Sequence, residues 1–64
     1  MKYFYDVLNT VFDTYGVHAD FTDLVNAAKL FGIEPQVKKG EDISDSKITE
    51  RQFDILVEYL GEKF

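Results

Sequence analysis

The chain has 64 residues, 45% of them hydrophobic, with a formal net charge of −5, one histidine and no cysteine. A chain this short has room for one small core, and its composition excludes disulfide staples, thiolate metal sites and multi-histidine zinc sites. The negative charge also argues against nucleic acid and anionic lipid as partners, because their phosphates repel it.

The first predicted helix covers residues 2–15. Apolar side chains recur there at the three- and four-residue spacing of one helix face, and polar side chains lie opposite them. Gly16 is suited to the left-handed position that commonly ends a helix. The core residues expected from this helix are Phe4, Leu8, Val11 and Phe12.

The second predicted helix covers residues 21–31. Asp20 or Thr22 is suited to cap its start, and Gly32 is suited to end it. The core residues expected from this helix are Phe21, Leu24, Val25, Ala28 and Phe31.

A connector over residues 33–47 separates this helix from the third one, predicted over 49–63. We expect Val37 and Ile43 to hold the connector against the core. Thr49 and Gln52 have the spacing of a capping box, in which each side chain bonds the backbone amide of the other. The core residues expected from the third helix are Phe53, Leu56, Val57 and Leu60.

Three amphipathic helices without an alternating strand pattern predict an all-α fold. We expect a single helical domain over residues 1–64, a small three-helix domain with a long irregular connector between helices 2 and 3.

Some apolar residues lie off these core faces. Ile55 and Tyr59 are one turn apart on the third helix and point away from its core stripe, and Leu30 lies off the core face of the second helix. Two interpretations are open. In the first, the connector covers Ile55 and Tyr59, so that both belong to the core. In the second, they form an exposed patch that docks a partner or a second copy.

The third helix also carries a row of carboxylates. Glu50, Asp54, Glu58 and Glu62 recur every four residues and are called the acidic ridge below. Like charges at this spacing are mildly destabilising. The row is interpreted either as an ordinary solvated face or as a surface aimed at a basic partner.

Catalytic, metal and cofactor sites are not indicated. His18 is interpreted as a turn residue, since no nucleophile, base and orienting acid occur in a recognisable pattern. Residues 41–53 resemble the end of an EF-hand calcium loop, but Ile43 occupies a ligand position and Gln52 replaces the bidentate Glu of that loop. We therefore expect no enzyme activity, no metal and no cofactor.

Residues 24–33 are similar to the first helix and turn of a helix-turn-helix motif, with Ala28 and Gly32 four apart. The resemblance implies a transcription regulator that binds DNA through residues 24–40. Lys29, Lys38 and Lys39 are the basic residues available there for phosphate contacts.

The composition and the patterning together favour a small acidic protein-interaction module without enzymatic function. Such chains look like regulators or inhibitors, including those that bacteriophages encode against host machinery. We expect a protein partner to dock on helix 3, and the acidic ridge would suit a basic one. The predicted partner-binding residues are Ile55, Tyr59, Glu58, Glu62 and Leu30. The alternatives are the DNA-binding regulator and a structural homo-oligomer such as a homodimer.

The sequence also bears on location. Without a secretory signal or an apolar run of membrane-spanning length, we expect a cytoplasmic protein that does not enter membranes.

Overall fold

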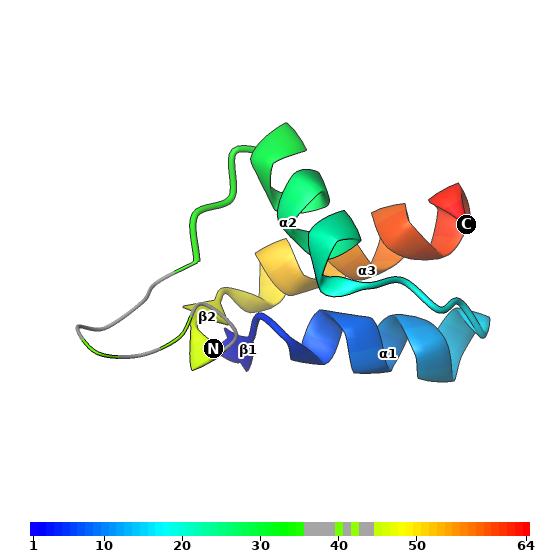
Figure 1. The fold of residues 1–64 in the computed structure, drawn as a ribbon, viewed down its shortest axis with the longest axis horizontal. Helices are drawn as coiled ribbons and strands as arrows, with labels where there is room; N and C mark the ends of the chain where they lie inside the picture. The colour runs from blue at the N-terminus through cyan, green and yellow to red at the C-terminus, as the bar shows by residue number, and fades with distance from the viewer. Residues whose placement is uncertain (36–39, 41, 43–44) are drawn as a thin grey trace.

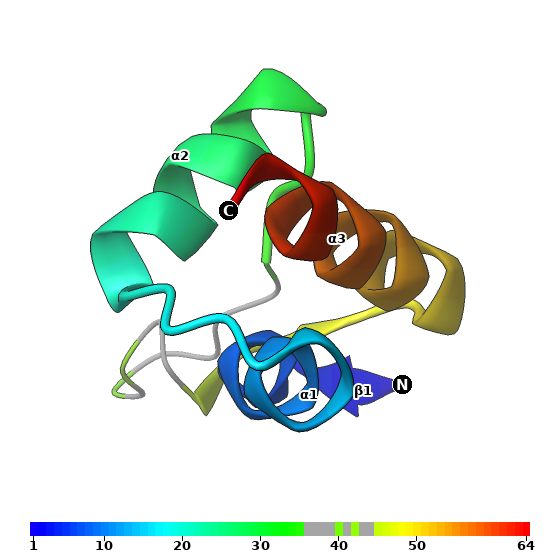
Figure 2. The same cartoon turned by 90° about the vertical axis from the view of Figure 1, so that its right-hand side faces the viewer.

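The computed structural model of the protein describes residues 1–35, 40, 42 and 45–64. α1 and α3 run in the same direction, away from the end of the molecule that holds the two strands, and α2 runs back across them (Figure 1). Viewed from the C-terminal end of α3, the three helices lie around a common centre (Figure 2). Within the described ranges, no helix is long and apolar enough to cross a membrane. The elements are β1 (Lys2–Tyr3), α1 (Asp6–Tyr15), α2 (Phe21–Leu30), β2 (Lys47–Ile48) and α3 (Glu50–Lys63).

The N-terminal residues form a strand where the sequence predicted a helix. β1 and β2 pair antiparallel, with Tyr3 opposite Lys47. The backbone N–H of Phe4 donates to the Ser46 carbonyl at 2.8 Å and continues the pairing. Because these amides bond across to the returning connector, α1 begins only at Asp6. The domain is mostly helical, but the prediction of an all-α fold missed this two-stranded sheet.

Local signals in the sequence set the starts of α2 and α3. The Asp20 side chain accepts a hydrogen bond from the Asp23 backbone N–H at 2.9 Å, and Asp23 returns a bond to the Asp20 N–H. Thr49 and Gln52 make the same reciprocal pair of bonds at the start of α3. The predicted capping box at Thr49 is confirmed, and Asp20 is the cap of α2.

The end of α2 turns the chain inward at Ile33. The Ile33 N–H donates to the Ala28 carbonyl and the Gly32 N–H to the Lys29 carbonyl, with Gly32 at φ +68°. This is the Schellman arrangement, which brings the residue after the glycine against the helix. Ile33 is buried as a result, while Phe31, just past the last helical residue, is 44% exposed. The prediction that places Phe31 in the core is therefore wrong.

The core lies between the three helices. α1 is rotated so that Val7 and Val11, at one edge of its apolar stripe, face inward. Phe12, at the other edge, is 48% exposed, so its prediction as a core residue is wrong. Leu8, Phe21, Val25 and Val57 are half-buried and pack against the core, whereas Val37 and Ile43 lie outside the described residues. The buried apolar residues are Phe4, Val7, Val11, Leu24, Ala27, Ala28, Ile33, Ile48, Phe53, Leu56 and Leu60.

A glycine lets α3 pack on the end of α1. A Cβ atom at Gly61 would overlap the ring of Tyr15. Alanine is the better helix former by up to about 1 kcal/mol, but the overlap must displace the ring. We therefore expect Gly61→Ala to lower the free energy of unfolding by about 1–2 kcal/mol. When Tyr15 is also replaced by alanine, Gly61→Ala should instead raise the free energy of unfolding, by up to about 1 kcal/mol. Urea unfolding of the wild type, the two single variants and the double variant measures both effects. An effect of Gly61→Ala with the same sign in both backgrounds would contradict this explanation.

Candidate protein-docking surface

α3 presents one side to the core and another to the surface. Phe53, Leu56 and Leu60 are buried in the core. Ile55 and Tyr59, which the sequence singles out, are both half-buried. Tyr59 packs against the core cluster. The pair therefore lies at the border between the buried side of α3 and its exposed side.

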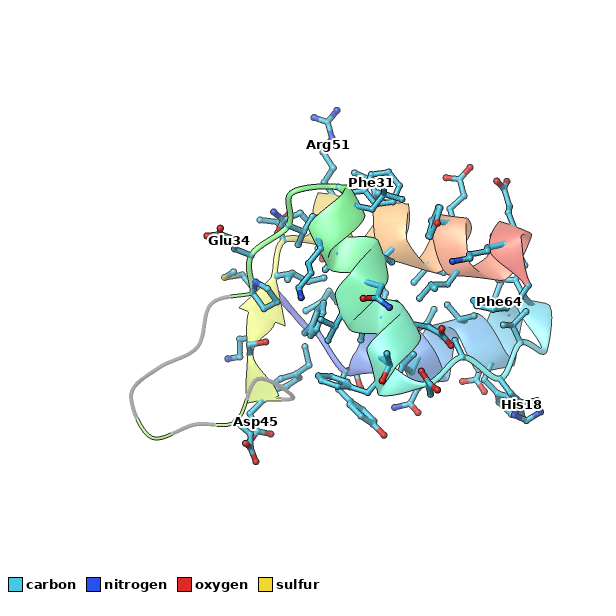
Figure 3. The ribbon with its side chains drawn as sticks, turned by 45° about the horizontal axis from the view of Figure 1, so that its top comes forward. His18, Phe31, Glu34, Asp45, Arg51 and Phe64 are labelled. Atoms are coloured by element: carbon cyan, nitrogen blue, oxygen red, sulfur yellow. The ribbon has the colours of Figure 1, made fainter. Side chains whose placement is uncertain are left out.

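Tyr59 is held by the ring of Phe31, the residue directly after α2. The centroids of Tyr59 and Phe31 are 5.2 Å apart, with the rings nearly perpendicular at 84°. This edge-to-face arrangement is a favourable geometry for two aromatic rings. The Lys63 ammonium lies 5.6 Å from the centroid of the Tyr59 ring. Phe31 lies at the C-terminal end of α2 beside α3, while His18 and Phe64 lie at the other end of the molecule (Figure 3).

The contact between Phe31 and Tyr59 brings the end of α2 against α3, and two further apolar residues lie next to this pair along the chain. Leu30 precedes Phe31 and is 65% exposed, and Ile55 lies one turn before Tyr59. Leu30, Phe31, Ile55 and Tyr59 are called the α2–α3 patch below. The sequence pattern singled out three of them and missed Phe31. Phe31 directly precedes Gly32, the residue that ends the helix. The spacing that defines a helix face therefore does not predict the direction of the Phe31 side chain, and this position was the available signal.

Carboxylates border this patch. All four residues of the acidic ridge are exposed. Glu58 lies three residues after Ile55, and Glu62 lies three residues after Tyr59, so each carboxylate neighbours a patch residue on the helix. Among the described residues, no cation pairs with the ridge. The surface thus combines an apolar centre with an unneutralised acidic edge.

The other residues considered from sequence lie elsewhere or outside the described ranges. Lys29 is exposed in the last turn of α2, and Lys38 and Lys39 are not among the described residues. His18 is exposed, with its ring 4.6 Å from that of Phe12. Among the described residues, no group of three or more His, Asp or Glu side chains is placed to hold a metal ion.

Comparisons of the chain with protein-family models, with curated proteins and with solved structures found no match. The α2–α3 patch and its charges are the observations on which a function can rest.

Proposed function

We propose that the protein is a small acidic interaction module that docks on a protein partner through the outer side of α3 and thereby regulates or inhibits it. The observation that carries this proposal is the α2–α3 patch, with exposed Leu30 and Phe31 beside the half-buried Ile55 and Tyr59. Contiguous exposed apolar surface on a small domain commonly marks an interaction site. Aromatic residues are enriched at the centres of such interfaces, which fits Phe31 and Tyr59.

The charges indicate the chemistry of the partner. Glu58 and Glu62 stand one turn apart and repel each other, which makes the isolated helix slightly less stable. A partner with basic side chains around an apolar centre would relieve this repulsion on binding. The whole chain carries a net charge of −5, so its field also attracts a basic surface from a distance.

Neutralising these two carboxylates should change stability and binding in opposite directions. We expect Glu58→Gln/Glu62→Gln to raise the free energy of unfolding by about 0.2–0.5 kcal/mol at low salt, because a like-charge pair is removed. Retention of a basic partner from a lysate on the immobilised protein should fall about ten-fold, because the steering charge is lost. Thermal unfolding and quantitative mass spectrometry of the retained proteins measure the two effects.

A control variant with the same change in net charge separates a local effect from a global one. Asp13 and Glu34 are exposed carboxylates outside α3, and Asp13→Asn/Glu34→Gln should retain the partner nearly as well as the wild type. The proposal fails if both double variants lose the same proteins equally, since the retention then depends only on total charge.

The two alternative functions predict different results. A DNA-binding regulator that uses residues 24–40 would shift a DNA duplex in a gel at low salt and lose this on Lys29→Glu/Lys38→Glu. A homo-oligomeric subunit would melt at a temperature that rises with protein concentration. The docking proposal expects neither behaviour.

A further inference from the structure

The start of the chain carries two exposed tyrosines. Tyr3 and Tyr5 flank Phe4, whose side chain is fully buried in the core, while both tyrosine side chains are exposed. Among the described residues, Tyr3, Tyr5, Asp6 and Asp45 line an open pocket of about 420 Å³ at the surface, called the tyrosine pocket below. Its volume lies in the range of small-molecule sites. Asp45 lies at the strand end of the molecule, away from His18 and Phe64 (Figure 3).

Neighbouring structure holds the Tyr5 ring and the Tyr3 backbone. Tyr5 stacks on Phe21, with centroids 6.0 Å apart and an interplanar angle of 25°. Phe21 in turn packs at 82° to the buried Phe4 ring, which ties Tyr5 to the core. Tyr3 belongs to β1, where its backbone pairs with Lys47. The Tyr5 ring is therefore positioned before any ligand arrives, and the backbone of Tyr3 is fixed by the strand pairing.

One ring of the pocket already contacts a cation, from a lysine beside the lining residues. The Lys47 ammonium lies 5.1 Å from the centroid of the Tyr3 ring, within cation–π range. Among the described lining residues, Asp6 and Asp45 contribute two negative charges, and the Lys47 ammonium beside the Tyr3 ring offsets one of them. One negative charge beside electron-rich rings favours a ligand with one positive charge.

We propose that the tyrosine pocket binds an organic ammonium group, with the rings of Tyr3 and Tyr5 against its alkyl surface and the carboxylates of Asp6 and Asp45 as countercharge. The group is either part of a free small cation or the head of a methylated lysine side chain, since both present the same chemistry. This site is separate from the α2–α3 patch, because it is built from β1, the start of α1 and the residue before Ser46.

The test is an NMR titration of the ¹⁵N-labelled protein with choline and with 3,3-dimethylbutan-1-ol, the neutral molecule of the same shape. We expect saturable shifts of the Tyr5 and Asp6 amides with choline, and binding at least about ten-fold weaker for the alcohol. A short peptide carrying trimethyllysine forms the third arm. Tighter binding of the peptide than of choline assigns the group to a protein, and the reverse assigns it to a free cation.

Variants of exposed residues keep the test independent of folding. We expect Asp45→Asn to weaken choline binding about three-fold and Tyr3→Leu about five-fold. Lys47→Met removes the competing internal cation and should tighten binding about two-fold. Asp13→Asn, an equal change of charge on the exposed side of α1, should leave binding unchanged. Equal binding of choline and the alcohol, or no effect of Asp45→Asn and Tyr3→Leu, would overturn the proposal.

Discussion

Phe4→Ala lowers the free energy of unfolding by about 3–5 kcal/mol, whereas Phe12→Ala lowers it by less than about 1 kcal/mol. The two residues have the same side chain and belong to the same apolar stripe in the sequence. Phe4 is fully buried and packs against Phe21, so its removal leaves a cavity that three helices and a strand cannot close. Phe12 lies half in solvent and loses mainly its contact with the His18 ring. Urea unfolding of both variants measures the difference.

A domain of this size has a total stability of about 3–10 kcal/mol, so Phe4→Ala can leave no folded protein. In that case Phe4→Leu, with an expected cost of about 1–1.5 kcal/mol, provides the comparison with Phe12→Leu. Equal costs at the two positions would contradict the burial of Phe4 and the exposure of Phe12 described above. They would support the symmetric stripe that the sequence alone predicts.

Replacing both Ile55 and Tyr59 by alanine should weaken partner binding at least about 30-fold, the loss expected when two residues at the centre of an interface are removed. The cost in unfolding free energy should stay at about 1–2 kcal/mol, because both side chains are only half-buried. Circular dichroism establishes that the variant is folded, and retention of the partner on the immobilised protein measures binding.

Phe12→Ala is the matched control for this loss. Phe12 is about as exposed as Phe31 but lies on α1, so its truncation removes exposed aromatic surface without touching the α2–α3 patch. Binding should be retained in this control. A loss of binding in both variants would show that the partner is retained by exposed apolar side chains wherever they lie on the protein. The assignment of the docking surface to α3 would then be wrong.

The sequence predicted the helices best where the signal is local. The start of α3 follows from Thr49 and Gln52 alone, and the end of α2 from Gly32, because caps depend on residues within one turn. The pairing of β1 with β2 was missed because two-residue strands leave no period to detect. Which residues pair across a connector depends on the tertiary fold, which a local pattern does not contain.

The sequence likewise predicted some features of the candidate sites and missed others. That Ile55 and Tyr59 lie together follows from their spacing on a helix. That Tyr59 meets Phe31 edge-on does not, since this contact depends on how α2 crosses α3. The acidic ridge was visible as a four-residue repeat, whereas the tyrosine pocket needs Asp45 beside Tyr3, and those residues are far apart in the chain.

The central claim is that the outer side of α3 contacts a foreign protein. A photoreactive amino acid at position 55, with the same group at position 12 as control, tests this directly by crosslinking in a lysate. We predict adducts with a larger, basic protein from position 55 alone, and a clear loss of these adducts in Glu58→Gln/Glu62→Gln. Equal adducts from positions 55 and 12 would contradict this claim. So would a result in which position 55 crosslinks to no protein except a second copy of the chain.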